Sequence, residues 1–341
     1  MHRNPGMTNR HRRGMLACAT LAAITASYGC ADRGNADEGR DRAFYGPRGD
    51  TLAATTGVNL AGRIESLHGP ESVRYDPVQD VFFVSNMMGP GSSKDGAGYI
   101  ARIAAATLDS VDVFIESGKN GAVLNAPKGM AIQGDTLWVA DIDVVRGFDR
   151  ETGKPLRTIT FAMPITLLND IAVAPDGTMY VTDTGIAMTD KGVLKPGGDK
   201  VIAISPTGAI SVRADSSAIG WPNGVTWDAH GNRWIVVTFE PFESKVFALG
   251  HSSSGDAGPA TPIASGAGRF DGVEVLGDGT MLVAGWNDHA LHMITPDGRD
   301  RKIVGALTQP ADIGVDTRRN RVAIPQALRG IVDVWTLPPR P

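Results

Sequence analysis

The chain has 341 residues, of which 42% are hydrophobic and 21% are charged, and its formal net charge is −4. This length allows one large or two ordinary domains, and the mild charge excludes gross disorder and a polybasic nucleic-acid-binding protein. The only cysteines are Cys18 and Cys30, so neither a disulfide framework nor a cysteine-ligated zinc site can form downstream.

The first 30 residues are typical of an export signal. Three arginines within residues 10–13 precede an apolar run over residues 15–26, which has the length of a signal-peptide core and is too short to cross a bilayer. The run ends at Ser27-Tyr28-Gly29-Cys30, which resembles a bacterial lipobox although Ser27 stands where leucine is commoner. We therefore expect a periplasmic protein that touches the membrane only through a lipid on Cys30; ordinary cleavage nearby, which releases a free periplasmic protein, is the alternative.

Residues 31–57 are polar and show no hydrophobic periodicity. A segment of this composition is predicted to be a flexible tether. The remaining residues, 58–341, are predicted to form one domain.

From residue 63 onward one pattern recurs: a first strand, a tight turn and a second apolar strand. Glycine and proline total 63 residues, about 18% of the chain against about 12% on average, and such a composition favours short strands joined by turns. The six first strands are predicted to begin at Glu71, Lys128, Asn169, Asn223, Asp271 and Ala311. A mean spacing of about 48 residues is typical of β-propeller blades, and no long stretch has the 3.6-residue period of a helical solenoid.

The sequence thus predicts an all-β, six-bladed β-propeller. Such a ring is commonly closed by pairing an N-terminal strand with the last blade. Residues 58–64 have a suitable pattern for pairing with residues 331–337.

The first residues of the six inner strands are expected to gather at one mouth of the central channel. Four of them carry side-chain oxygens: Glu71, Asn169, Asn223 and Asp271. Such a set suits a hard divalent cation, Ca²⁺ before Zn²⁺, with Mg²⁺ or Mn²⁺ as alternatives. Asn and Asp also stabilise turns, which explains any single position, but Glu71 is no turn former. We call these six positions the ring.

Four motifs resemble the regucalcin/gluconolactonase (senescence-marker-protein) family of six-bladed propellers over residues 63–337: Glu71 five residues before Asp76, Asn169-Asp170, Pro222-Asn223-Gly224 and Phe270-Asp271-Gly272. The resemblance implies that Glu71, Asn223 and Asp271 bind a divalent metal. It also implies that Asn169 holds water or substrate beside the metal, and that Asp271 is the general base in lactone hydrolysis. Similar rings occur in diisopropylfluorophosphatase-like and strictosidine-synthase-like propellers, so the motifs identify the site better than the substrate.

Two segments depart from this family. Glu71-Ser72-Val73 replaces Glu-Gly-Pro, and Pro127-Lys128-Gly129 is closer to an NHL-type repeat, a class often used for binding. We expect Lys128 to bind substrate, by polarising a carbonyl or holding an anionic group. The alternatives are that its charge lowers the affinity for metal, or that its long stem points to solvent.

Two segments, 87–98 and 184–198, are longer than blade connections need. Both follow second strands, so they are expected beside the ring, as lids or as mere decoration. Residues 239–242 are expected at the same rim. Asp141, Asp143 and Asp183 are interpreted as strand-end caps, with lining of the mouth as the alternative. His289 and His292 are interpreted as surface residues of an outer strand.

Two function classes remain open. The first is a metal-dependent hydrolase of a lactone or related ester, and the second is a non-catalytic exported propeller that binds a ligand, glycan or protein. The chain has no Gly-x-Ser-x-Gly or His-Glu-x-x-His motif. In either case we expect a monomer that binds a small molecule or partner and no nucleic acid.

Overall fold

The computed structural model describes residues 53–251 and 258–339. These residues belong to one compact unit that spans Arg40–Pro341. The predicted signal segment with Cys30, and residues 31–52 of the predicted tether, lie outside the described residues.

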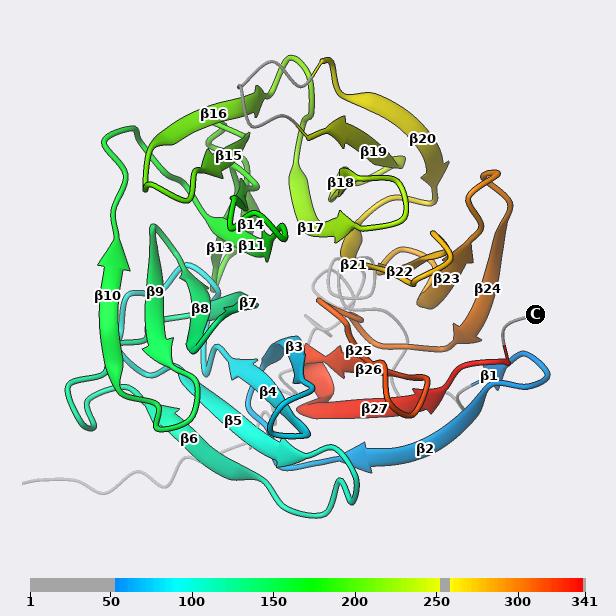
Figure 1. Cartoon of the computed structure of the whole chain (residues 1–341), viewed down its shortest axis with the longest axis horizontal. Coiled ribbons are helices and arrows are strands. Elements are labelled where there is room, and N and C mark those ends of the chain that lie inside the picture. Colours follow the sequence, from blue (N-terminus) through cyan, green and yellow to red (C-terminus); the bar gives the residue numbers. More distant parts are fainter. Residues whose placement is uncertain (1–52, 252–257, 340–341) are drawn as a thin grey trace, which may run out of the picture. The chain divides into compact units, whose positions relative to one another are not determined.

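Within the described residues, six sheets surround a central axis as the blades of a propeller (Figure 1). Blade 1 consists of β3 (Pro70–Asp76), β4 (Val81–Asn86), β5 (Tyr99–Ala104) and β6 (Asp112–Glu116). Blade 2 consists of β7 (Pro127–Gln133), β8 (Thr136–Asp141), β9 (Val144–Asp149) and β10 (Pro155–Ile159). Blade 3 consists of β11 (Leu168–Val173), β12 (Met179–Asp183), β15 (Lys200–Ile204) and β16 (Ile210–Asp215).

The second half of the chain repeats this arrangement. Blade 4 consists of β17 (Pro222–Asp228), β18 (Arg233–Thr238), β19 (Ser244–Gly250) and β20 (Thr261–Gly266). Blade 5 consists of β21 (Phe270–Val275), β22 (Met281–Gly285), β23 (Ala290–Ile294) and β24 (Asp300–Gly305). Blade 6 consists of β25 (Gly314–Asp316), β26 (Arg321–Gln326), β27 (Ile331–Thr336) and the N-terminal β2 (Asn59–Ile64). The predicted all-β, six-bladed fold is confirmed.

The N-terminal strand closes the ring of blades. β2 pairs antiparallel with β27, with Leu60 opposite Trp335 and Ile64 opposite Val332, so the predicted closure is confirmed. The end of the predicted tether also joins the sheet, because the short β1 (Ala53–Ala54) pairs with β24. Two outer edges are thereby covered, which removes unpaired backbone groups.

Six apolar clusters fill the spaces between neighbouring blades. They form because alternate residues of each strand face opposite sides of its sheet, so each blade presents apolar side chains to both neighbours. Between blades 3 and 4, for example, the rings of Tyr180 and Trp234 stack with centroids 4.0 Å apart. These clusters hold the inner strands in fixed positions around the channel.

Glycine lets neighbouring inner strands approach closely at the axis. A Cβ atom at Gly129 would lie 2.2 Å from Asp170 Oδ1, and one at Gly272 would lie 2.5 Å from the Cα atom of Asp312. Any larger residue at either position would push two blades apart.

The sixth inner strand is shorter than predicted. β25 begins at Gly314 rather than at Ala311. Ala311 still bonds to its own blade, because its N–H donates to Pro325 O of β26 at 3.1 Å. Asp312 bonds to the neighbouring blade: its N–H donates to Glu71 O at 2.8 Å, and Val73 N donates to Asp312 O at 3.1 Å. These bonds to β3 interrupt the expected strand and join the last blade to the first at the channel.

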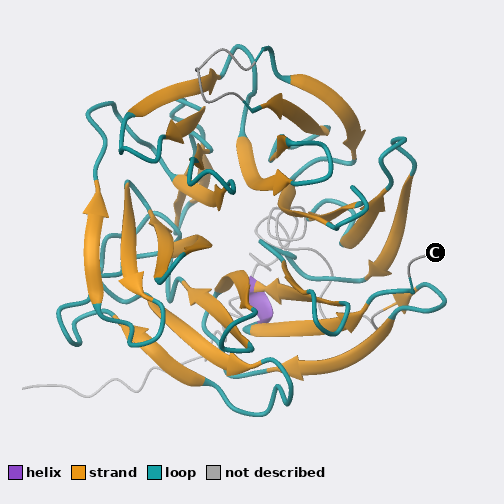
Figure 2. Cartoon of the chain, viewed as in Figure 1, coloured by secondary structure: helices purple, strands orange, loops and turns teal. Residues whose placement is uncertain are grey.

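In the described part of the chain, the sole helical element is the 3₁₀ turn η1 (Ala327–Arg329), and strands dominate (Figure 2). None of the described residues form a helix with the length and apolarity needed to traverse a bilayer.

Candidate functional site

A repeated backbone irregularity positions the ring residues. In blades 1–5 the residue before each ring residue pairs with the last residue of the second strand, as Pro127 does with Asp141 and Leu168 with Asp183. In all five blades the register then shifts. Such a bulge changes the direction of a side chain, which then no longer follows the alternation between the two faces of the sheet. The sequence repeat therefore places one ring residue from each of these blades at the same mouth of the channel.

Strand-end carboxylates fix the chain as it enters the ring. Asp141 Oδ1 accepts hydrogen bonds from the backbone N–H groups of Asn125 and Ala126, both at 2.9 Å. Asp183 does the same for Thr166 at 3.0 Å and Leu167 at 2.9 Å. The predicted role of Asp141 and Asp183 as caps is confirmed, and it sets the positions of the adjacent Lys128 and Asn169. Asp143 instead forms an ion pair with Lys94 at 2.5 Å.

The four oxygen-bearing ring residues are buried, with exposed fractions of 6% for Glu71, 4% for Asn169, 2% for Asn223 and 4% for Asp271. Each has one side-chain oxygen without a hydrogen-bond partner: Glu71 Oε2, Asn169 Oδ1, Asn223 Oδ1 and Asp271 Oδ1. A buried oxygen without a partner is costly and rare in folded proteins. Four of them at one mouth make a donor set that matches a hard cation.

The charge of this donor set is small. No three His, Cys, Asp or Glu side chains group together in metal-binding fashion among the described residues. The ring has two carboxylates, Glu71 and Asp271, and its other two oxygen donors are the neutral amides of Asn169 and Asn223.

Burial raises the pKa of Glu71 and the pKa of Asp271, the two carboxyl groups of the ring, well above their ordinary values. The pKa of Glu71 is raised further by the charge of Asp271 and lowered by that of Lys128. The pKa of Asp271 is raised further by Asp312 and Asp170, while a hydrogen bond from Trp286 lowers it. Both carboxyl groups therefore hold a proton more readily than in water, and a bound cation would oppose this effect.

Lys128 is fully buried, with 0% of its surface exposed. Its Nζ donates hydrogen bonds to Gly91 O at 2.6 Å and to Ala126 O at 3.0 Å. Burial lowers the pKa of Lys128, and the charges of Glu71, Asp141 and Asp271 offset this only in part. Of the three alternatives that the sequence left open, a stem that points to solvent is excluded.

The two long segments meet each other beside the ring. Segment 184–198 contains a hairpin of β13 (Ala187–Thr189) and β14 (Gly192–Leu194). Ser92 N donates to Met188 O at 3.2 Å, and Met188 N donates to Ser92 Oγ at 2.8 Å. Because Lys128 binds Gly91 of segment 87–98, the joined loops are tied to the ring. Their predicted location at this mouth is confirmed.

A seventh apolar cluster lies at this mouth and was not predicted. Its members lie in the segments that follow the second strands of blades 1–5 or that enter the first strands of blades 2 and 3. We call them the collar: Met87, Ala126, Ile142, Leu167, Ile186, Phe239 and Trp286. Met188, Val193 and Trp221 pack against it. Phe239 lies at the rim as expected, whereas Phe242 is 91% exposed. A sequence signal existed, since four collar residues directly follow the last residue of a second strand.

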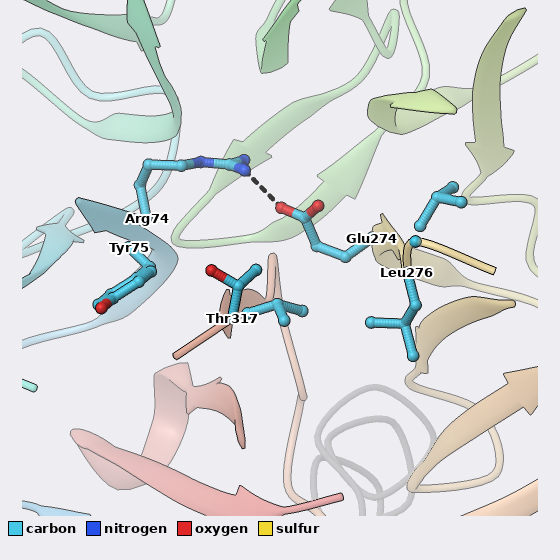
Figure 3. A pocket seen from close by; sticks show the side chains of 8 residues that line it. Arg74, Tyr75, Glu274, Leu276 and Thr317 are labelled. Carbon is cyan, nitrogen blue, oxygen red and sulfur yellow. Dashed lines mark hydrogen bonds and ion pairs between the residues drawn. The ribbon is translucent and has the colours of Figure 1, made fainter. Parts of the chain in front are cut away.

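The opposite end of the channel is lined by paired side chains, which were also not predicted. Arg74 and Glu274 form an ion pair that Figure 3 shows reaching between blades 1 and 5, beside a pocket of about 140 Å³. Arg74 Nε also donates to Met130 O at 2.7 Å. Between this pair and the ring, Ser72 Oγ donates to Asp312 Oδ2 at 2.5 Å, and Asp312 Oδ1 has no hydrogen-bond partner among the described residues. Burial raises the pKa of Asp312 to about 7.

The interpretation of His292 as a surface residue is wrong. His292 is 2% exposed, and its two ring nitrogens contact Asp288 at 2.8 Å and Asp300 at 2.9 Å. It lies on β23, the third strand of blade 5, where neighbouring blades and strands cover both faces. Its position is therefore structural and separate from the ring.

Comparison with known proteins agrees with the motifs. Residues 162–313 match the family model described as the SMP-30/Gluconolactonase/LRE-like region. The matched segment contains Asn169, Asn223 and Asp271, and the resemblance predicted from the motifs is confirmed. No curated protein is similar to the chain in sequence.

Solved structures resemble the whole propeller. A gluconolactonase of Xanthomonas campestris is 14% identical, with a TM-score of 0.63 over 86% of this chain and 100% of its own. A structural-genomics target with a provisional gluconolactonase name is 15% identical, with a TM-score of 0.59 over 84% of this chain and 96% of its own. At these identities the likeness shows the shared fold.

Proposed function

We propose that the ring is the active site of a metal-dependent hydrolase that opens lactones or related esters. One observation carries the proposal: four buried oxygens without hydrogen-bond partners, on Glu71, Asn169, Asn223 and Asp271, lie at one channel mouth. The match to the gluconolactonase family model and the gluconolactonase fold of the structural neighbours support the choice of reaction.

The donor set is compatible with a divalent cation, Ca²⁺ before Zn²⁺, Mg²⁺ or Mn²⁺. Glu71, Asn223 and Asp271 would hold it, and Asn169 would lie beside it. Hard oxygen donors favour Ca²⁺, whereas Zn²⁺ prefers nitrogen and sulfur ligands. When bound, the cation supplies Lewis-acid stabilisation of charge on the substrate carbonyl oxygen.

Asp271 is suited to accept a proton in this reaction. Burial raises the pKa of its carboxyl group above the ordinary value, which makes the carboxylate a stronger base than an exposed one. Asp271 takes a proton from water as the water oxygen bonds to the lactone carbonyl carbon. The C–O bond within the lactone then breaks. The alkoxide oxygen takes the proton back from Asp271, which yields a hydroxy acid.

Asn169 and Lys128 complete the proposed site. Asn169 has a free Oδ1 with which to orient water or substrate. The Lys128 ammonium is held by two backbone carbonyls near both carboxylates. It thus adds a fixed positive charge that favours an electron-rich carbonyl or an acidic product.

The test is metal analysis of the purified protein, followed by hydrolysis of a lactone panel with and without chelator. We expect bound divalent metal and activity that chelation abolishes and Ca²⁺ restores. Absence of hydrolysis across the panel with Ca²⁺, Zn²⁺, Mg²⁺ and Mn²⁺ would contradict the proposal and favour a binding propeller.

We also propose that the protein works in the cell envelope, anchored through Cys30. This proposal is supported by the arginines and apolar run of the first 30 residues. Cell fractionation of the wild type and Cys30→Ser tests it. The variant should move from the membrane to the soluble fraction, and equal distribution of both forms would exclude the lipid anchor.

A further inference from the structure

The collar and the ring are neighbours because the pairing of first with second strands fixes the positions of both. Met87, Ile142, Phe239 and Trp286 each directly follow the last residue of β4, β8, β18 and β22. The residues that end these strands pair with the residues that precede the ring. Ala126 and Leu167 lie just before β7 and β11, two residues ahead of the ring residues Lys128 and Asn169. Any molecule that reaches the ring from this mouth therefore passes the collar.

The loops pack against the collar and contact the ring through Lys128. A Cβ atom at Gly91 would lie 3.0 Å from Met188 Sδ and 3.3 Å from Met87 Sδ, so both thioethers lie against this backbone. The carbonyl of the same Gly91 accepts the hydrogen bond from Lys128. A chain of direct contacts thus runs from the ring, through Lys128 and Gly91, to two methionines.

This enclosure differs in chemistry from the ring beneath it. The collar is made of aliphatic, thioether and aromatic side chains, and the side chains that pack against it are Met188, Val193 and Trp221. A hydroxyl placed among them would lose its hydrogen bonds with water, which is costly. An alkyl or aryl group placed there would gain from leaving water, and methionine adapts its shape to such groups.

We propose that the substrate is a lactone with an apolar alkyl or aryl substituent, rather than a polyhydroxylated sugar lactone. The inference rests on the proposed function: the ring takes the carbonyl end, and the collar takes the substituent together with the side chains that pack against it, Met188, Val193 and Trp221. The joined loops part to admit it and close on it, which excludes water from the ring.

A matched pair of six-membered lactones tests the preference. The wild type with Ca²⁺ is assayed on δ-decalactone, which carries a pentyl chain, and on δ-gluconolactone, which carries hydroxyl groups. We expect kcat/KM to be at least about tenfold higher for δ-decalactone, since a few methylenes in an apolar pocket supply this much discrimination. An equal or higher value for δ-gluconolactone overturns the inference and leaves the proposed function standing. Hydrolysis of neither lactone overturns the inference, and the proposed function falls with it only if the full panel of lactones and metals also shows no activity.

Two variants of the hairpin test whether the enclosure causes the preference. Met188→Ser alters a side chain packed against the collar, whereas Leu194→Ser alters one on the same hairpin that is 55% exposed. We expect Met188→Ser to raise KM about tenfold for δ-decalactone and hardly at all for δ-valerolactone, which has no substituent. Leu194→Ser should match the wild type on both, and circular dichroism verifies folding. Equal effects of Met188→Ser on the two lactones, or no effect, contradict the assignment.

Discussion

The two ends of the channel are built by the same inner strands but treat their polar groups in opposite ways. At the ring end, four buried oxygens have no partner, and the nearby Lys128 is bound to backbone carbonyls. At the far end, three residues further along the same strands, Arg74 is paired with Glu274 and with Met130 O. Unpaired groups lower stability and are retained where a ligand satisfies them, whereas paired groups hold the fold. We therefore interpret the ring end as arranged to bind a ligand and the far end as arranged to hold the fold.

The largest effect is expected at the ring, from Asp271→Asn. The amide keeps the shape and one oxygen donor but cannot accept a proton, and loss of general-base work costs about 10²–10⁴-fold in rate. Stability without metal should not fall, because a buried carboxyl with a raised pKa is replaced by a neutral group. Turnover at saturating Ca²⁺ and thermal unfolding with chelator measure the two effects.

Asn169→Ala serves as the comparison for Asp271→Asn. It should slow turnover less, because Asn169 orients groups and exchanges no proton. Wild-type turnover in Asp271→Asn, with circular dichroism showing the native fold, would exclude the proposed mechanism.

Arg74→Met should give the reverse pattern at the far end. It leaves the partly buried Glu274 without its cation. The loss of unfolding free energy should lie between the roughly 1 kcal/mol of an exposed pair and the roughly 3–5 kcal/mol of a fully buried one. The turnover of molecules that remain folded should change little, since Arg74 lies away from the ring. Urea unfolding and kcat measured below the transition provide the values.

The double variant Arg74→Met, Glu274→Met sharpens this test. Replacing both charges by apolar groups of similar size should recover most of the lost stability. If the double variant is as unstable as Arg74→Met, the ion pair is not the source of the effect.

Lys128→Met tests a residue that lies at the ring but whose side chain is hydrogen-bonded, as the side chains at the far end are. It removes the positive charge near Glu71 and Asp271 and frees the carbonyls of Gly91 and Ala126. Without metal the variant should therefore be less stable. The stabilisation gained on adding Ca²⁺ should be larger than in the wild type, because a cation then replaces the ammonium without repulsion.

Melting temperatures of wild type and Lys128→Met, with chelator and across a Ca²⁺ titration, give the comparison. A smaller Ca²⁺-induced rise in the variant would indicate that Lys128 supports metal binding rather than opposing it.

The smallest effect concerns pH and lies outside the channel. Burial lowers the pKa of His292, but its hydrogen bonds and charge interactions with Asp288 and Asp300 outweigh this effect and raise the pKa. A raised folded-state pKa means that the stabilisation is fully present below the unfolded value, about 6.5, and is lost as pH rises through the folded value. Thermal unfolding between pH 6 and 9 should show this loss.

His292→Gln is the control, because it has no charge to lose. Asp312, whose pKa is raised to about 7, also loses stability with rising pH, but from about pH 4 upward. The difference between wild type and His292→Gln isolates the histidine, and equal slopes above pH 6.5 would contradict its role.

The sequence by itself determined the architecture and the ring. The repeat of strand, turn and strand gave the six blades, because hairpin turns and period-two alternation are local properties. The positions of Glu71, Asn169, Asn223 and Asp271 followed, since equivalent residues of a cyclic repeat meet at the axis. The pairing of β2 with the last blade could also be predicted, because a cyclic repeat has to close on itself.

Only the tertiary structure decided how side chains from different blades meet. The collar joins residues from five blades, the Arg74–Glu274 pair joins positions 200 residues apart, and Lys128 finds Gly91 on another blade's loop. The burial of His292 and the pairing of Asp312 with β3 likewise depend on neighbouring strands and blades. Such contacts depend on distances between distant parts of the chain, which no local pattern of residues contains, and they decide which buried groups are satisfied and which await a ligand.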